Sequence, residues 1–330
     1  MTTTAITVIS AHSSTAILGF DTSILAGELA PSSIRMYTQD LATYLQFAGY
    51  SATMALRPST LARWRTELVN NTIQSASTIN RRLSGVKSTF KWAAEQGYIS
   101  AQVAEEFARV QGVKAKTLIE KRKAQGVETS PGRPHNRTKM EPADMRKITT
   151  APDATRLSGK MHRALLFTLA SSACRISEVC TLTQGQITKG VGTSGKVGYM
   201  LSIMGKGQDE PRDALLSPEA YGYIQEWLTA RVAAGVDVPS IFTGFEGRGD
   251  KRLTDKPLST AGAWQMVQRY AAQVGLTHIK PHDFRRFVGT IHAKKNIRTA
   301  QKILGHKRIE TTAKHYVLDE LELGLTDDMF

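Results

Sequence analysis

The sequence predicts a mainly α-helical protein with a small antiparallel β-sheet, an α+β fold in which a helical N-terminal domain precedes a mixed C-terminal domain. Three observations lead to this prediction. The chain has 330 residues, which is more than one ordinary hydrophobic core organises. Apolar residues recur at spacings of three and four through much of residues 31 to 110. In the second half, two strand-like segments flank the turn-rich heptapeptide GKGQDEP, which is the pattern of a β-hairpin.

The sequence of the N-terminal part predicts a flexible arm followed by a bundle of short helices. Residues 1 to 30 are rich in Thr, Ser and Ala and carry no basic residue, so we expect a largely flexible arm. Three helices should follow, with starts at Ser32 or Ser33, at Ser59 or Thr60 and near Ser77, and with glycine stops at Gly49 and Gly97. The third has a basic, polar surface that could meet DNA through Arg81, Lys87 and Lys91. A solvated helix face explains the same pattern.

Residues 111 to 140 are predicted to be a basic interdomain linker. Nine Lys or Arg residues lie between Arg109 and Lys139, against Glu120 and Glu128, and the stretch SPGRPHNRTKM has no apolar period. A basic linker between two DNA-binding lobes would lie along phosphates, with Lys121, Arg122 and Lys123 as contacts. A linker that is merely solvated fits the composition equally well.

The C-terminal domain should begin near Glu141 and alternate helices with the hairpin. An apolar helix over residues 164 to 169 leads to SSACRISEVCTL, and strands are expected at 199 to 203 and 212 to 216 with Lys206 near the tip between them. Ser217-Pro218-Glu219 is a strong helix start, and that helix should end before Gly235. A further helix is expected from about Ser259 to Val274.

Composition limits the class of protein. The hydrophobic fraction is 41%, and no apolar run approaches the ~20 residues of a membrane span. The two cysteines, Cys174 and Cys180, fall in an apolar helical stretch, so we expect small core residues in a cytosolic protein. The formal charge of +14 and the pI near 9.8 favour a polyanionic partner, most often nucleic acid. A basic but otherwise ordinary enzyme is the alternative.

The strongest signal is the stretch from 282 to 316, HDFRRFVGTIHAKKNIRTAQKILGHKRIETTAKHY. His282 and Arg285 are three apart, so on a helix they share a face and can point at one phosphate oxyanion. Tyr316, ten residues after His306, could supply a hydroxyl nucleophile to the phosphorus held there. The stretch resembles the C-terminal signature of the tyrosine recombinases, the phage integrase family.

Other positions match the same family in order. Arg175 and Glu178 in CRISEV resemble its first arginine and the acidic partner, Lys206 resembles its hairpin lysine, and His306 in LGH stands where members carry His or Trp. The resemblance implies that Arg175 and Arg285 clamp the phosphate, that Lys206 protonates the leaving oxygen and that Glu178 supports the basic residues. Two guanidinium forks can stabilise the developing charge without a metal, so we expect no metal, no other cofactor and no ATP.

Two departures from the family pattern stand out. Arg286 follows Arg285 where many members carry histidine. The separation of His306 and Tyr316 is ten residues, one more than in most members, with His315 in the extra place. No other tyrosine follows, so Tyr316 remains the expected nucleophile.

Composition and the resemblance together predict a domain plan. It gives an arm at 1–30, a helical core-binding domain at 31–110, a linker at 111–140, a catalytic domain at 141–318 and an acidic tail at 319–330. The tail carries five acidic residues and no basic one, with leucines between them, and we expect it to dock on a neighbouring protomer. A frayed tail, or one folded back on its own subunit, is the alternative.

The implied function is a site-specific recombinase or integrase that cuts and rejoins DNA through a covalent 3′-phosphotyrosine. Its partners would be double-stranded DNA with an inverted-repeat core site and three further copies of the chain on paired sites, with accessory DNA-bending proteins left open. It would be a bacterial, archaeal or phage-encoded protein of the cytoplasm, associated with the nucleoid and not with a membrane. The alternatives are a type IB topoisomerase or telomere resolvase with the same chemistry, and a catalytically inactive DNA-binding regulator.

Overall fold

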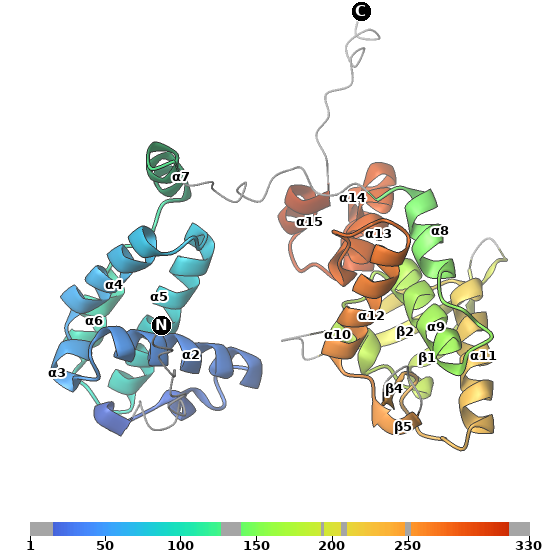
Figure 1. Ribbon diagram of the computed structural model, residues 1–330, viewed down its shortest axis with the longest axis horizontal. Coiled ribbons are helices and arrows are strands. Elements are labelled where there is room, and N and C mark those ends of the chain that lie inside the picture. Colours follow the sequence, from blue (N-terminus) through green and yellow to red (C-terminus); the bar gives the residue numbers. More distant parts are fainter. Residues whose placement is uncertain (1–15, 127–139, 193–194, 206–209, 248–251, 317–330) are drawn as a thin grey trace, which may run out of the picture. The chain divides into compact units, whose positions relative to one another are not determined.

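The computed structural model describes residues 16–126, 140–192, 195–205, 210–247 and 252–316. The chain divides into two compact units, Met1–Pro134 and His135–Phe330, and each has a hydrophobic core of its own. Both units are largely helical, and the strands belong to the second (Figure 1). No helix in these ranges combines the length and the apolar character that crossing a bilayer requires.

The N-terminal unit is a bundle of short helices. Its elements are η1 (Ala16–Leu18), η2 (Thr22–Leu25), α2 (Pro31–Phe47), α3 (Ala52–Ala55), α4 (Pro58–Asn71), α5 (Ala76–Glu95), α6 (Ala101–Arg109) and α7 (Ala115–Ala124). The predicted serine starts of two helices are wrong, because α2 and α4 begin at Pro31 and Pro58 instead. Proline suits the first helical position, where its missing N–H would have no partner. α5 begins one residue before the predicted Ser77 and is capped by Ser75, whose hydroxyl accepts the N–H of Thr78.

Aromatic rings form the centre of this unit. Tyr44 of α2 lies against Trp64 of α4, Phe90 of α5 and Phe107 of α6, with ring centroids 5.3 to 6.4 Å from its own. The Tyr44 hydroxyl donates to the carbonyl of Ala55 at 2.8 Å, which satisfies it inside the core. The helices α2 to α6 therefore enclose one continuous hydrophobic cluster.

The prediction of a flexible arm is wrong for the described part of residues 1–30. Phe20 and Leu25 are buried, and Phe20 packs edge-on against Phe90 at 6.0 Å. The side chain of Gln96 also donates to the carbonyl of Ile24 at 3.0 Å. One aromatic and one aliphatic side chain, Phe20 and Leu25, are therefore enough to pack this Ser/Thr-rich segment against the bundle. Residues 1–15 lie outside the described ranges.

The predicted linker begins as a helix. α7 occupies 115–124, and it buries Leu118 and Arg122 against the N-terminal unit. Arg122 is 6% exposed, and its guanidinium donates to the carbonyls of Thr72 and Gln74 at 2.8 and 2.7 Å. The linker prediction is therefore wrong for 115–124, because arginine can bury its stem while its fork satisfies backbone acceptors. The stretch 127–139 is not described.

The C-terminal unit is mixed. Its helices are α8 (Pro142–Thr150), α9 (Leu157–Ser172), α10 (Ile176–Cys180), η3 (Gln184–Gln186), α11 (Pro218–Ala233), α12 (Thr260–Gln273), α13 (Pro281–Lys295), α14 (Ile297–Leu304) and α15 (Ile309–Tyr316). The predicted starts at Ser217 and Ser259 are confirmed, since both hydroxyls accept a backbone N–H of the first turn.

The strands form two antiparallel sheets. β1 (Ile187–Val191), β2 (Val197–Met204) and β3 (Pro211–Leu216) are ordered β1-β2-β3, while β4 (Thr243–Glu246) pairs with β5 (Arg252–Pro257). The predicted hairpin is the β2–β3 pair, in which Leu201 faces Ala214. Leu201, Ile203, Ala214 and Leu216 are buried against the helices. The fold class predicted from the sequence, mainly α with a small antiparallel sheet, is confirmed.

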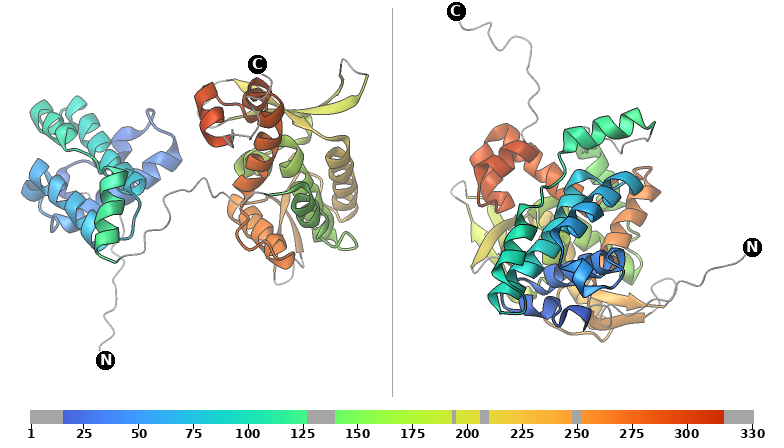
Figure 2. Two further views of the ribbon diagram at one scale, coloured as in Figure 1. Left: turned by 90° about the horizontal axis from the view of Figure 1, so that it is seen from above. Right: turned by 90° about the vertical axis from the view of Figure 1, so that its left-hand side faces the viewer.

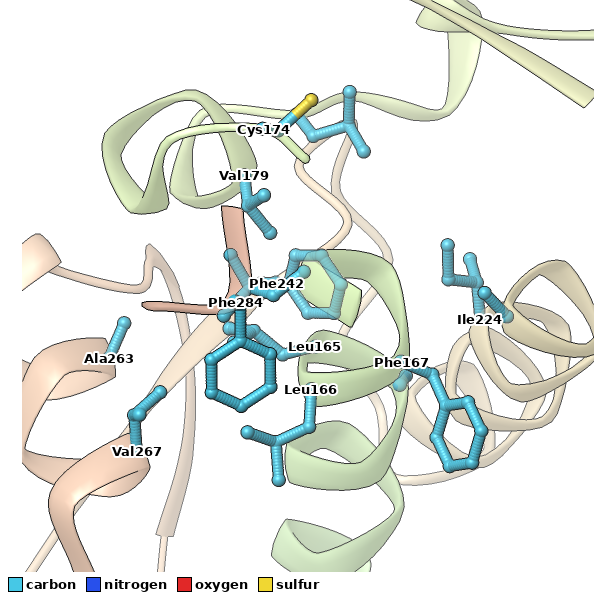
Figure 3. Close-up of a cluster of buried hydrophobic side chains, with 14 of the residues drawn as sticks. Leu165, Leu166, Phe167, Cys174, Val179, Ile224, Phe242, Ala263, Val267 and Phe284 are labelled. Carbon is cyan, nitrogen blue, oxygen red and sulfur yellow. The ribbon is translucent and has the colours of Figure 1, made fainter. Parts of the chain in front are cut away.

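Helix α9 runs through the core of this unit. Leu165 and Leu166 of α9 cluster with Phe284 of α13 and Phe242, and Phe167 faces α11 (Figure 3). α13, α14 and α15 pack on one another, and α14 also contacts β3 (Figure 2). The core therefore fixes the end of α9, the start of α13 and the base of the hairpin with respect to each other.

Candidate active site

The site is built around the end of α9. The helix stops at Ala173, whose φ of +54° places a non-glycine residue in the left-handed region. This turn directs Cys174 into the core and Arg175 outward to the start of α10. Strained backbone of this kind persists where surrounding contacts hold it. Here the contact is a hydrogen bond to the Ala173 carbonyl from Arg285 at 2.6 Å.

Arg175 is paired with Glu178. The Arg175 Nη1 donates to Oε1 of the carboxylate at 2.7 Å, and its backbone N–H donates to Oε2 at 2.7 Å. The Arg175 side chain is 42% exposed, whereas that of Glu178 is 4% exposed. Burial alone would raise the pKa of Glu178, but the Arg175 N–H and the charges of Arg212 and Arg175 outweigh it and hold that pKa below its usual value. The carboxylate therefore stays ionised and aims an exposed guanidinium.

Arg285 is the buried arginine of the site. It is 1% exposed, and its guanidinium donates to the carbonyls of Ala173 and Leu304. Burial, and then the charge of Arg175, lower its pKa, while Tyr316 opposes the change. A guanidinium remains protonated at neutral pH all the same. Arg285 thus ties the end of α9 to the end of α14 and contributes a buried positive charge.

His282 stands one helical turn before Arg285 at the start of α13. Loss of water around part of the ring, and then the charges of Arg286 and Arg285, lower the pKa of His282 to about 4, although the residue as a whole is exposed. The imidazole is therefore neutral at pH 7 and can accept a proton or a hydrogen bond. Arg286, the departure from the family pattern, is paired with Asp283 at 3.0 Å.

His306 follows the turn that ends α14. Gly305 closes the helix with a φ of +61°, and the side chain of Gln301 donates to the His306 carbonyl at 3.0 Å. The His306 Nδ1 lies 2.9 Å from the Thr312 hydroxyl, which fixes the ring against α15. The ring is therefore held by α14 and α15 together.

Tyr316 is buried beside these residues. It is 3% exposed and clusters with Ala173, Val288 and Leu304, and its ring centroid lies 5.5 Å from that of His306. A Cβ at Gly289 of α13 would lie 2.5 Å from the tyrosine ring, so the glycine provides the room for it. The ten-residue separation of His306 and Tyr316 therefore still brings the two rings together.

Arg212 is the site residue that the sequence did not single out. It lies on β3, and its Nη2 donates to Oε2 of Glu178 at 2.8 Å while its Nη1 donates to the carbonyl of Ile303 at 3.3 Å. A signal for it exists in the strand pattern. Arg212 is on the same face as Ala214 and Leu216, which are buried, and a charged residue on the core face of a strand needs a partner inside the protein.

The remaining predicted residues are Lys206 and the expected DNA contacts of the N-terminal unit. Lys206, the expected proton donor, falls in the segment between β2 and β3 that is not described. Arg81 is bound to Asp40, Lys87 donates to the carbonyls of Val110 and Ala108, and Lys121 donates to Asn70. Arg122 is buried, so the expectation that it contacts DNA is withdrawn. Arg81, Lys87 and Lys121, which are partly exposed, remain predictions as DNA contacts. So do Lys91, paired with Glu95 at 3.6 Å, and Lys123, which is exposed.

Five of the predicted residues form one cluster within the C-terminal unit. Arg175, Glu178, Arg285, His306 and Tyr316 come from four separate segments and converge on Ala173 and the end of α14. Exposed and buried guanidiniums beside a tyrosine suit attack on a phosphodiester, because the forks can hold the non-bridging oxygens while the hydroxyl approaches phosphorus. Within the described ranges, no set of three or more His, Cys, Asp or Glu residues is placed to hold a metal ion.

Comparison with known proteins identifies the family of the chain. The sequence pattern of the phage integrase family matches residues 138–321, and that of the phage integrase N-terminal SAM-like domain matches residues 20–97. A tyrosine recombinase XerC of Myxococcus xanthus is 25% identical over 296 residues, 87% of each chain. XerC of Chlamydia caviae is 30% identical over 169 residues, which are 50% of this chain and 49% of the relative. The match thus spans about half the length of that relative and of two Neisseria meningitidis XerD proteins.

Solved structures share the fold. The XerH site-specific recombinase bound to a difH substrate, in a pre-cleavage complex, aligns with a TM-score of 0.63 and 16% identity over 94% of this chain and 82% of the other. A λ integrase fragment, crystallised as a dimer bound to a core site, aligns with a TM-score of 0.60 and 14% identity over 94% of this chain and 99% of the other. At these identities the likeness concerns the fold.

Proposed function

The chain belongs to the phage integrase family, and on that premise we propose that it is a site-specific DNA recombinase that cuts and rejoins strands through a covalent 3′-phosphotyrosine. The observation that carries the proposal is the position of Tyr316. It packs beside His306 and against Leu304, the residue whose carbonyl Arg285 holds. A tyrosine in ring contact with a histidine, packed against a helix end that a buried arginine holds, is suited to attack on a phosphodiester.

The reaction follows from these residues. The Tyr316 oxygen attacks the phosphorus, a P–O bond to tyrosine forms, and the bond to the 5′-oxygen breaks. Arg175 and Arg285 stabilise the charge that grows on the non-bridging oxygens. The tyrosine proton passes to a nearby histidine or is lost with the help of the cationic pocket, and the 5′-oxygen takes a proton from Lys206. Reversal by a 5′-hydroxyl of another strand reseals the DNA, so no ATP is consumed.

The units divide the work. We assign DNA binding to residues 31–110 and catalysis to residues 141–318. The proposed contacts to phosphates are Arg81, Lys87, Lys91, Lys121 and Lys123. A λ integrase tetramer bound to a Holliday junction is among the structures with this fold, with a TM-score of 0.60 and 14% identity. For this chain we propose the same kind of assembly, a homotetramer on two duplexes whose core sites are inverted repeats. Its place would be the cytoplasm, on the nucleoid.

The test is capture of the covalent intermediate. The substrate is a nicked duplex built on inverted repeats that flank the gene. After cleavage the short fragment between the cleavage site and the nick, which carries the free 5′-hydroxyl, dissociates, so the strand cannot be resealed and the protein stays bound to the DNA. The wild-type protein should form this adduct equally well in EDTA, and Tyr316→Phe should form none while binding the same DNA, since it loses one oxygen and no charge. An adduct with Tyr316→Phe would reassign the nucleophile. DNA binding without any adduct by the wild type would favour the regulator.

A further inference from the structure

Arg212 closes a ring of contacts around the proposed site. Its Nη2 donates to Oε2 of Glu178, and the other carboxylate oxygen accepts from Arg175. Its Nη1 donates to the carbonyl of Ile303, next to the Leu304 carbonyl that Arg285 holds. Arg285 completes the ring by donating to Ala173, two residues before Arg175. β3, α10, α13 and α14 are thereby joined by three arginines and one carboxylate.

The position of Arg212 is determined closely by its surroundings. Its side chain is 10% exposed, and both of its terminal nitrogens donate to acceptors of the protein, Glu178 and Ile303. It passes directly over Gly305, where an added Cβ would meet its Cδ and lie 2.9 Å from its Nε. The glycine also has a φ of +61°. The turn that leads into His306 is therefore shaped against the Arg212 side chain.

The charge of Glu178 makes Arg212 necessary. The carboxylate is buried and accepts from two guanidiniums and one backbone N–H. Without Arg212, Arg175 would be the carboxylate's sole remaining cationic partner within the described ranges, and a buried anion attracts its remaining partner more strongly. Arg175 would then be drawn toward Glu178 and away from a phosphate. With Arg212 present, the two guanidiniums share the carboxylate, and the Arg175 side chain remains 42% exposed.

We propose that Arg212 is a positioning residue for DNA cleavage: by neutralising Glu178 and bracing the α14 turn, it keeps Arg175 available to the scissile phosphate. The inference rests on the proposed recombinase function. It gives a third arginine a task in the reaction without contact with the substrate. It also explains why the hairpin that carries Lys206 is fastened to the site at its base.

The experiment compares Arg212→Met and Arg212→Lys with the matched control Arg252→Met. Arg252 lies on β5, is paired with Glu246 and is 75% exposed, so its loss removes a surface ion pair far in sequence from the cluster. Single-turnover cleavage of the nicked duplex, binding of the same duplex and thermal unfolding are measured for each protein. Displacement of a catalytic group by about 1 Å can slow a reaction about 10²-fold, so Arg212→Met should cleave the duplex about that much more slowly than the wild type. It should bind DNA like the wild type. Arg212→Lys should fall between, and Arg252→Met should match the wild type.

Two further measurements separate the proposed role from general damage. In Arg212→Met/Glu178→Gln the uncompensated anion is gone, so the double variant should cleave no more slowly than Arg212→Met. The defect of Arg212→Met should persist on a 5′-bridging phosphorothiolate, whose leaving group needs no proton. Additive losses, or full rescue by the phosphorothiolate, would overturn the role through Arg175. So would wild-type cleavage by Arg212→Met, or a loss of DNA binding equal to the loss of cleavage.

The outcome for the proposed function is read separately. If the wild type forms no adduct, the recombinase proposal fails, and the thermal data still test the contact between Arg212 and Glu178. Arg212→Met should lower the unfolding temperature of the wild type more than that of Glu178→Gln. Equal shifts in the two backgrounds would show that the two side chains are not coupled.

Discussion

Replacement of Arg285 by lysine should separate the stability that this residue provides from its part in the chemistry. The guanidinium reaches two carbonyls, Ala173 at 2.6 Å and Leu304, from a side chain that is 1% exposed. A lysine ammonium is a single point and can satisfy one of them. The other carbonyl is left buried without a donor, which costs about 1–3 kcal/mol. We expect the unfolding free energy of Arg285→Lys to fall by that amount.

The effect on cleavage should be larger. Loss of an oriented donor to developing negative charge slows such reactions by about 10² to 10³-fold. The orphaned carbonyl at the end of α14 also loosens the turn before His306, so we expect the adduct to form at least that much more slowly. Binding of the duplex should change little, because it is spread over many phosphate contacts.

Arg231 provides the matched control. Arg231 lies on helix α11, outside the cluster, and is also fully buried, at 0% exposure. Its guanidinium donates to the carbonyls of Val238 and Ile241 at 2.7 and 3.1 Å. Arg231→Lys should lose a similar amount of unfolding free energy in urea and keep the wild-type cleavage rate wherever it is folded. If Arg285→Lys and Arg231→Lys cleave at the same rate under conditions in which both are folded, Arg285 has no part in holding the phosphate.

Three other predictions follow from the same contacts. The pKa of His282 is about 4 in the folded protein against ~6.5 for a free histidine, so between these pH values the unfolded state binds more protons. The unfolding free energy measured in urea should therefore rise with pH across that window, and it should rise less in His282→Gln. Lys206→Ala should slow cleavage of an ordinary phosphodiester and recover on a 5′-bridging phosphorothiolate, whereas equal defects on both substrates would assign Lys206 to binding. Deletion of residues 320–330 should leave binding to a single site intact and weaken assembly of paired sites; recombination at the wild-type level would make the tail dispensable.

Local signals in the sequence predicted the elements that have strong starts or strong alternation. Ser217-Pro218 and Ser259 mark helices because their hydroxyls satisfy backbone N–H groups within one turn. β2 and β3 alternate buried and exposed residues, so the hairpin was visible. β1 was not, because none of its five residues is buried. β4 and β5 were missed as well, with a single buried residue, Thr243, in the pair.

The site was predictable where its residues follow one another closely, and less so where arginines bind distant carbonyls. His282, Arg285, His306 and Tyr316 fall within 35 residues. In the structure the rings of His306 and Tyr316 are in contact, and Arg285 donates to Leu304, which packs with Tyr316. The contact of Arg122 with the residues after α4 spans about fifty positions, and that of Arg212 with Ile303 spans 91. Such bonds leave no periodic pattern. For that reason α7 was mistaken for a linker and Arg212 was not recognised.

The arrangement of the arginines has a consequence for catalysis. The last carbonyls of a helix have no N–H partner within the helix and lie at the negative end of its dipole. At the end of α14, Arg212 donates to the carbonyl of Ile303 and Arg285 to that of Leu304. Two like charges are thus balanced by Glu178 and by backbone dipoles before any DNA arrives. Groups fixed in this way need little rearrangement when charge develops on a phosphate, which is the condition for electrostatic stabilisation of a transition state. Gly305 is part of that condition, because a side chain there would push Arg212 away from both the helix end and Glu178.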